Sequence, residues 1–475
     1  MNEWILQIND VLWTDVLIGT LIVCGLWFTW KTRFVQFRMV GEMVRLLGEA
    51  EVRENEERDE DGKQGTKRKR VSSFQAFAVS VATRVGTGNL AGVATAIAVG
   101  GPGAVFWMWV IALIGSATAF VESTLGQLYK QRHEESFIGG PAYYIRKGLH
   151  CRWMSVLFAV LLTVTFGLSY NSIQSNTICA SMQGAFGWSP LWVGVVLTVL
   201  SLFIVFGGIH RIARVSSVLV PVMAVGYFLL VVVIVVMNIG LISHVLKVIV
   251  TSAFGLEQAV GGGLGATMMN GIKRGLFSNE AGEGSAPNVA ATADVSHPVK
   301  QGLIQALGVF TDTLLVCSCT AFVILISGLY ATTDLNGIAL TQEALQSEIG
   351  SWGPIFIAVA IFLFAFSSII GNYYYGEANI RFLTSRRWVM TVYRLCSGGL
   401  MVMFGALASL QLVWSLGDLC MALLTACNLV AIVALGRHAF RLLDDYRQQK
   451  KQGIKSPTFH RHQLPDIAGD VECWE

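Results

Sequence analysis

The stretch NGIKRGLFSNEAGEGSAPNVAATA, residues 270–293, decides how the chain folds. It has the length of a membrane span, yet its centre, FSNEAG at 277–282, consists mostly of small and polar residues. Such residues disfavour helix and tolerate an unwound backbone. Inside a bilayer, an unwound backbone is tolerated only where it is buried in protein or lines a cavity. The stretch therefore predicts a membrane helix that is interrupted at a binding cavity.

A second interrupted segment lies nearer the N-terminus. The sequence VSVATRVGTGNLAGVATA, residues 79–96, carries Gly86, Thr87, Gly88 and Asn89 at its centre. The two breaks lie five spans apart, each in the first helix of a five-span unit. Interrupted helices at matching positions in two halves are typical of inverted-repeat transporters, whose site lies near the midplane of the membrane. The alternative interpretation is a packing motif in which the glycines only allow close helix contact.

The composition indicates a membrane protein. Hydrophobic residues make up 53% and charged residues 14% of the 475 positions, against about 25% charged residues in a soluble domain. Such a chain cannot cover its surface with polar groups, so much of that surface must face lipid. The 49 glycines favour close packing of membrane helices.

Apolar segments of spanning length predict about eleven transmembrane helices. The first follows acidic rather than basic residues and lacks a small-residue cleavage site. We therefore expect it to be a spanning helix rather than a signal peptide. The predicted spans are 11–30, 72–98, 103–128, 153–182, 189–207, 215–240, 262–293, 301–329, 353–379, 388–409 and 411–436.

The distribution of Lys and Arg predicts an orientation. Lys247 is the only Lys or Arg in four alternate loops, which are 98–103, 184–190, 240–257 and 330–352. Because cytoplasmic loops are enriched in Lys and Arg, we expect an outer N-terminus and a cytoplasmic C-terminus in the cell inner membrane. The segments predicted to be cytoplasmic are 31–70, 130–152, 210–214, 297–300, 381–387 and 437–461.

Three predicted cytoplasmic segments differ in character. Residues 31–48 mix apolar and basic residues at helical spacing, which is typical of a helix lying on the inner surface. Residues 49–70 alternate acids and bases, and we interpret them as an inside anchor rather than a nucleic-acid patch. Residues 437–475 are polar, and we expect a mobile tail.

The first break suits a charged ligand at each of its ends. Unwinding the helix at Gly86–Asn89 frees backbone N–H groups at the start of its outer half, where the helix dipole favours an anion. A substrate carboxylate would bind there. Carbonyl groups freed at the end of the inner half suit a monovalent cation, because hard cations take oxygen ligands.

Charged residues inside predicted spans need partners or a function. For Arg84 we expect an ion pair with Glu280 that holds the two unwound segments in register, rather than substrate contact. Glu122 or Asp312 would be the next partner of Arg84, and Lys273 and Arg274 are the other candidate partners of Glu280.

Other embedded acids allow several roles. Glu283 either has a function in the membrane or reaches cytoplasmic water. Asp312 and Asp418 each fit an ion or proton relay, a helix-pairing group or a residue near the interface.

Adjacent hydroxyl groups lie deep in the ninth apolar segment. Ser367 and Ser368 could complete an oxygen cage that backbone carbonyls begin, although serine also bonds its own helix backbone. The cysteines inside apolar runs fit small apolar filler, and we interpret Cys24, Cys179, Cys317, Cys319, Cys420 and Cys427 in this way. No phosphate-binding loop, nucleophile elbow or zinc-protease helix occurs in the sequence, so we expect neither an ATPase motor nor an enzyme.

Four runs resemble the alanine or glycine:cation symporter family. They are RVGTGNLAGVATAIAVGGPGAVFWMWV (84–110), GGPAYYI (139–145), GLFSNEAGEGSAPN (275–288) and FAFSSIIGNYYYGE (364–377). The likeness extends from about residue 10 to 440.

The resemblance implies an all-α polytopic protein of the leucine-transporter type, with ten core helices in two inverted five-helix repeats. One extra helix would precede them. The implied divisions are 1–71 (first helix and charged segment), 72–240 and 241–436 (the two repeats) and 437–475 (tail).

The resemblance also implies residue roles. The substrate carboxylate would bind the amides of Thr87 and Gly88, and Asn89 would serve the carboxylate or a second cation. Asn372 would form the floor of the pocket and help to set substrate size. The substrate amine and side chain would contact Phe277, Ser278, Asn279 and Gly282. One Na⁺ would take the carbonyls of Ala82 and Val85 and the hydroxyls of Ser367 and Ser368.

The expected function is therefore import of alanine or glycine coupled to Na⁺, with no organic cofactor. Proton-coupled amino-acid transport and a passive channel are the alternatives. A channel would need a continuous polar stripe along several helices, whereas polarity here concentrates at two breaks. A membrane-embedded enzyme would need a nucleophile or metal set, and the sequence shows neither.

Overall fold

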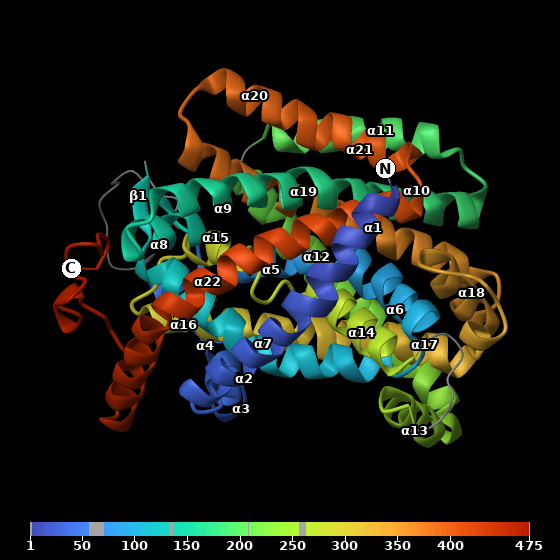
Figure 1. Cartoon of the computed structure of the whole chain (residues 1–475), viewed down its shortest axis with the longest axis horizontal. Helices are drawn as coiled ribbons and strands as arrows, with labels where there is room; N and C mark the ends of the chain where they lie inside the picture. The colour runs from blue at the N-terminus through green and yellow to red at the C-terminus, as the bar shows by residue number, and fades with distance from the viewer. Residues whose placement is uncertain (1, 57–70, 134–135, 208, 256–262, 475) are drawn as a thin grey trace.

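Long apolar helices dominate the computed structural model, which describes residues 2–56, 71–133, 136–207, 209–255 and 263–474 (Figure 1). Within these residues, seven helices are long and apolar enough to cross a membrane. The pair Ala224–Met237 and Ile239–Ala253, bent by 79°, would make an eighth. The chain is thus a multi-pass membrane protein. The seven are Trp4–Lys31, Ala104–Leu128, Arg152–Phe186, Pro298–Ser327, Trp352–Leu383, Arg387–Leu407 and Leu410–Lys451.

The other predicted spans are shorter or interrupted in the structure. The apolar helices Gly88–Gly100 and Pro190–Val205 (α11) are too short to count as spans by themselves. Residue 262, the first of the seventh predicted span, lies outside the described residues. The count of eleven crossings therefore stays a prediction.

Within the described residues, a small two-stranded sheet is inserted between the helices. The strands β1 (Gln131–His133) and β2 (Ser136–Ile138) pair antiparallel. The main helices not yet bounded are α1 (Asn2–Val11), α2 (Ile18–Lys31), α8 (Pro141–Gly148), α9 (Arg152–Val164), α10 (Asn171–Phe186), α12 (Ile209–Met237), α13 (Ile242–Ala253), α16 (Pro298–Val309), α17 (Ser318–Ser327), α18 (Ile338–Ile349), α20 (Arg387–Leu395) and α21 (Met401–Leu407).

Both predicted interruptions are present. Helix α5 (Ser73–Arg84) ends where Val85 adopts an extended ψ of 92°, and helix resumes in η2 (Gly88–Gly92) and α6 (Val93–Gly100). Helix α14 (Leu264–Asn279) ends at Glu280, whose φ of 56° is left-handed. Gly282, at φ 95°, continues this irregular stretch as far as α15 (Ala286–Ala290). Positive φ values favour glycine and end an α-helix, so the glycine-rich centre of this span explains its break.

The interrupted helices lie in the interior, surrounded by longer ones. Helix α7 (Ala104–Leu128) packs against α14 and α16, and α19 (Trp352–Leu383) packs against α5 and α10. Helices α11, α20 and α21 lie together at one edge (Figure 1). The long helix α22 (Leu410–Lys451) runs diagonally across the middle of the view toward the lower left (Figure 1) and packs against α7 and α9. The breaks are therefore enclosed by protein, as an unwound backbone in a membrane requires.

The segment expected on the inner membrane surface forms helices α3 (Val35–Arg38) and α4 (Val40–Glu56). Its apolar side chains Met43 and Leu46 are buried against the protein. Glu42 of α4 accepts a hydrogen bond from Tyr446 Oη of α22 at 2.6 Å. This face of α4 therefore packs on the protein itself. Of the charged segment that follows, residues 57–70 lie outside the described residues.

The prediction of a mobile tail is wrong. Helix α22 continues to Lys451, and the chain after it folds back along the same end of the molecule (Figure 1). Five apolar side chains of this returning segment are buried in the protein core. They are Phe459, Leu464, Ile467, Val471 and Trp474.

Candidate functional site

The two helix breaks contact each other. A Cβ added at Gly88 would lie 3.0 Å from Ser278 Cα and 3.1 Å from Phe277 Cδ1. Asn89 donates a hydrogen bond from Nδ2 to Ser278 Oγ at 3.1 Å. Gly88 and the side chains of Asn89, Phe277 and Ser278 are all buried. The structure thus brings together Gly88, Asn89, Phe277 and Ser278, from two segments that the sequence predicted to meet.

Backbone N–H groups released at the first break bond to amide oxygens. Gly86 N donates to Asn89 Oδ1 at 2.9 Å, and Thr87 N donates to Gln174 Oε1 at 3.0 Å. Gln174 comes from α10 and was not among the predicted site residues. Its carboxamide oxygen bonds the N–H that the sequence predicted for a substrate carboxylate. Thr87 Oγ1 is buried and has no hydrogen-bond partner within the described residues.

Uncharged oxygen atoms gather beside this break. Ser368 Oγ lies 2.9 Å from the carbonyl oxygen of Ala82 and 3.4 Å from that of Val85. Ser367 Oγ lies 3.4 Å from the Ala82 oxygen. Two hydroxyls and two carbonyls are the ligand type that a hard monovalent cation takes. The structure therefore brings together the four groups predicted to bind Na⁺.

Two other predicted substrate residues, Asn279 and Gly282, contact neighbouring helices. Asn279 Nδ2 lies 3.3 Å from Thr313 Oγ1, on the side of the neighbouring η5 helix (Phe310–Cys317). Gly282 contacts α7 and α22 instead: its N–H donates to Glu122 Oε1 at 3.3 Å, and its carbonyl accepts from Asn428 Nδ2 at 2.9 Å. These contacts hold the break in place, and they do not link Gly282 to Gly88.

Asn372 lies one helical turn beyond Ser368 on α19. Its side chain is 1% exposed, and neither its Oδ1 nor its Nδ2 has a hydrogen-bond partner within the described residues. A buried amide without partners is costly, so it is suited to bonding a polar ligand.

Asp312 belongs to the site, although the sequence left its role open. It is fully buried in η5 and accepts hydrogen bonds from Asn89 Nδ2 and Ser278 Oγ, both at 2.6 Å. Cys317 Sγ lies 3.1 Å from Ser278 Oγ. The interpretation of Cys317 as apolar filler is therefore wrong, because it contacts polar groups at the junction of the two breaks.

The predicted Arg84–Glu280 ion pair is absent from the described structure. Arg84 donates from Nη1 to the carbonyl of Gln305 at 3.2 Å, and its Nε and Nη2 have no partner in the described residues. Glu280 instead accepts from Ser285 Oγ at 2.6 Å. Because Glu280 ends α14 in a left-handed conformation, its carboxylate lies beside the residue that begins α15.

The alternative partners of Arg84 do not pair with it either. Neither Glu122 nor Asp312 forms an ion pair with Arg84 in the part of the chain that the structure describes.

Asp418 is a helix-pairing residue. Both of its carboxylate oxygens accept from Arg274 of α14, at 2.9 and 2.8 Å, and Lys273 lies 3.5 Å away. Lys273 and Arg274, the other candidate partners of Glu280, therefore pair with Asp418. The Arg274 guanidinium lies 4.2 Å from the Trp414 ring centre.

An aromatic layer separates this ion pair from the buried acids. Phe277 lies between Trp414 and Tyr170, with ring centres 4.8 Å away on each side. Tyr170 Oη donates to Glu283 Oε2 at 3.1 Å. Glu283 is fully buried, so the alternative that it reaches cytoplasmic water is wrong.

A family model and individual relatives of the chain point to the same family of membrane transporters. The model of the sodium:alanine symporter family matches residues 1–461. The probable sodium/glutamine symporter of Bacillus subtilis (strain 168) is 51% identical over 467 residues, 98% of this chain and 94% of that protein. The sodium/alanine symporter of Methanococcus maripaludis is 35% identical, covering 90% of this chain and 93% of that protein.

Among solved structures, the manganese transporter of Eremococcus coleocola, in complex with an aromatic bis-isothiourea substituted compound, matches with a TM-score of 0.49. It is 15% identical and covers 86% of this chain and 87% of that chain.

Proposed function

The chain belongs to the sodium:alanine symporter family, and on this premise we propose that it imports a small neutral amino acid together with Na⁺ by alternating access. The observation that carries the proposal is the oxygen set of Ala82, Val85, Ser367 and Ser368 beside the Gly88–Ser278 contact. A cation site next to unwound helix ends provides a physical route to coupling, because the ion stabilises the same break that binds the substrate.

The proposed architecture is two inverted five-helix repeats, 72–240 and 241–436, after one additional helix in 1–71. We propose eleven spans, an outer N-terminus and a cytoplasmic C-terminus in the cell inner membrane. The support for this orientation is that the segments around Arg33 and Arg45 contact the end of α22, so that Lys and Arg of 31–45 and of 437–461 lie at one end of the molecule.

The substrate is proposed to replace the Gln174 oxygen at the Thr87 amide with its own carboxylate, and to bond the Gly88 amide next to it. Its amine and side chain would contact Phe277, Ser278 and Asn279. Asn89 and Asp312 lie within bonding distance of Ser278 and would orient it. Gly282 has a structural part in this proposal, because it bonds Glu122 and Asn428.

Uptake into proteoliposomes tests the function directly. With an inward Na⁺ gradient, we expect alanine or glycine to accumulate above its external concentration, and a Na⁺ ionophore should abolish that accumulation. Accumulation driven by a pH gradient in the absence of Na⁺ would favour proton coupling. Equilibration without accumulation would identify a passive channel.

Replacing either hydroxyl of the oxygen set should weaken Na⁺ binding. Ser367→Ala or Ser368→Ala removes one oxygen ligand, so the Na⁺ concentration for half-maximal uptake should rise on the order of tenfold. The alanine KM at saturating Na⁺ should change less. Ser347→Ala, an exposed serine of α18, is the matched control. Unchanged Na⁺ dependence in both site variants would refute the assignment.

Glutamine is a second candidate substrate, and Asn372 favours it. A primary amide whose donor and acceptor are both unpaired is complementary to the carboxamide of a glutamine side chain. Asn372→Leu would then leave that carboxamide unpaired, and the KM for glutamine should rise about tenfold or more. Alanine uptake by the same variant is the internal control and should change little. Equal effects on both substrates would contradict side-chain recognition by Asn372.

A further inference from the structure

The chain after α22 contacts several helix ends at one end of the molecule. This tail segment, residues 454–474, contacts the stretch before α16: Phe459 N donates to the Ser296 carbonyl at 2.9 Å, and Ser296 Oγ donates to the Pro457 carbonyl at 2.8 Å. The Phe459 ring packs edge-on against His297 and Trp474, with ring centres 5.7 and 5.6 Å away. These contacts fix the tail segment to the chain that leaves the second interrupted helix.

Trp474, near the end of the tail segment, binds the end of α7. Its indole N–H lies 3.2 Å from the carbonyls of both Gln127 and Leu128. Its ring lies 4.5 Å from Lys130 Nζ, a cation–π distance. The side chain is 5% exposed. A tryptophan that is buried and bonded in this way stabilises the position of the α7 end.

The same α7 end holds the inner parts of both interrupted helices. Gln127 Nε2 and Lys130 Nζ donate to the Ala293 carbonyl, at 2.9 and 3.2 Å. Ala293 pairs with Val71, just before α5, and Asp294 N donates to the Val71 carbonyl at 3.2 Å. The start of the first broken span is thus joined to the end of the second, and Trp474 holds the end of α7 that bonds this junction.

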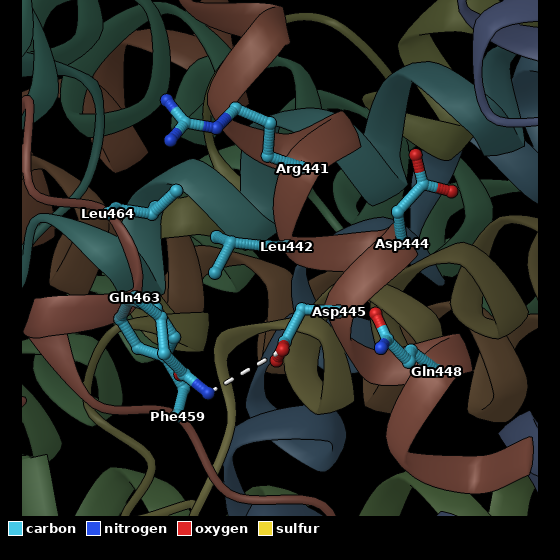
Figure 2. A pocket seen from close by; sticks show the side chains of 8 residues that line it. All are labelled: Arg441, Leu442, Asp444, Asp445, Gln448, Phe459, Gln463 and Leu464. Atoms are coloured by element: carbon cyan, nitrogen blue, oxygen red, sulfur yellow. Dashed lines mark hydrogen bonds between the residues drawn. The ribbon is translucent and has the colours of Figure 1, made fainter.

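Charged side chains of the tail segment form further contacts with α8 and α22. Glu472 pairs with Lys147 of α8, and Asp466 pairs with Arg441 of α22 at 2.7 Å. A cavity of about 290 Å³ remains between the tail segment and α22 (Figure 2). Figure 2 shows that side chains from α22 and from the tail segment both line it, with Gln463 reaching toward Asp445. The tail segment is therefore attached at several points along its length, and a cavity remains between it and α22.

We propose that the tail segment is a latch that holds the cytoplasmic ends of the two interrupted helices together, and that it must release before the site opens inward. The proposal rests on the proposed alternating access and on the cytoplasmic position of this end. Release of substrate inward requires the 71–84 and 286–296 segments, which contact each other, to separate. The contacts of Trp474 and Phe459 oppose that separation.

Amide hydrogen exchange on the full-length protein without substrate tests the latch. Trp474→Ala should accelerate exchange of residues 71–84 and 286–296 by about tenfold or more, because local opening becomes less costly. Residues 264–272, at the other end of α14, should not change. Gly469→Ala is the matched control within the tail segment, since a Cβ there meets no atom within 4 Å.

The region in which exchange becomes faster decides whether the latch proposal holds. Faster exchange confined to the tail segment itself would overturn the proposal. If Trp474→Ala does not fold, Trp474→Phe gives the same comparison, because it keeps a ring over Lys130 and loses only the indole N–H. The measurement needs neither Na⁺ nor an amino acid. A protein that shows the exchange pattern but accumulates neither alanine, glycine nor glutamine would disprove the proposed transport, and would confirm only that the tail segment restrains these helix ends.

Discussion

Gly88→Ala should reduce amino-acid uptake about a hundredfold, the scale of loss that small misplacements cause at a binding site. The added methyl group would lie 3.0 Å from the Ser278 backbone and 3.1 Å from the Phe277 ring. Contacts this short force one of the two breaks to shift, and the backbone of Ser278 cannot rotate away. The same methyl group would stand beside the amides proposed to bind the substrate carboxylate.

Gly92→Ala is the matched control, because its Cβ would lie 3.7 Å from Trp414 and 3.8 Å from the Thr87 carbonyl, ordinary contact distances. Both variants should purify with melting temperatures within a few degrees of each other, and only Gly88→Ala should lose uptake. Normal transport by Gly88→Ala would show that the contact between the breaks is structural and that the substrate binds elsewhere.

Asp418→Ala should be the most destabilising single substitution considered. It leaves Arg274 buried, with a 6% exposed side chain, and removes both carboxylate oxygens to which the guanidinium donates. Breaking one side of a buried ion pair typically costs about 3–5 kcal/mol, because the remaining charge has no compensation. Thermal denaturation of the purified protein in detergent measures the effect.

Two further variants make this interpretation specific. Asp444→Ala breaks a pair with Arg33 whose side chains are 66% and 59% exposed, and exposed pairs contribute about 0–1 kcal/mol. The double variant Arg274→Met, Asp418→Leu replaces the pair by apolar groups and should recover most of the lost stability. A double variant as unstable as Asp418→Ala would show that the loss comes from packing and not from charge.

The positions of the breaks were predictable because they depend on local sequence. Glycine and short polar residues inside an apolar run disfavour helix wherever the run lies, so residues 86–89 and 277–282 were identified without knowing their neighbours. Ser367 and Ser368 were predictable for a related reason, since two adjacent hydroxyls are conspicuous among apolar residues. Their contacts with Ala82 and Val85 follow once α19 packs on α5.

Partner choice was not predictable from local sequence. Arg274 and Asp418 are 144 positions apart, and only the crossing of α14 with α22 brings them together. Gln174 lies in the fourth predicted span, and nothing in the local sequence indicated that it would reach the Thr87 amide. Glu280 was assigned to Arg84 because both were expected at similar depth where the two broken helices meet. The left-handed backbone at Glu280 instead places its carboxylate beside Ser285.

The packing of the tail segment was missed for a different reason. Its buried side chains, such as Phe459, Val471 and Trp474, are separated by polar residues and follow no helical or strand period. Periodicity detects regular elements that bury one face. An irregular segment anchored by a few isolated side chains gives no such signal, so its polar composition led to the wrong expectation.

The oxygen set formed by Ala82, Val85, Ser367 and Ser368 consists of carbonyls and hydroxyls, without a carboxylate. A Na⁺ bound there keeps its full charge, and a neutral amino acid adds none, so the loaded carrier would move one positive charge inward. The membrane voltage then does work on every cycle, about 2.3 kcal/mol per charge at 100 mV. That work alone can sustain an amino-acid concentration inside the cell about fifty times the concentration outside. The Na⁺ concentration difference adds to this ratio. Transport should therefore be electrogenic, and cells would retain uptake even where inner and outer sodium concentrations are equal.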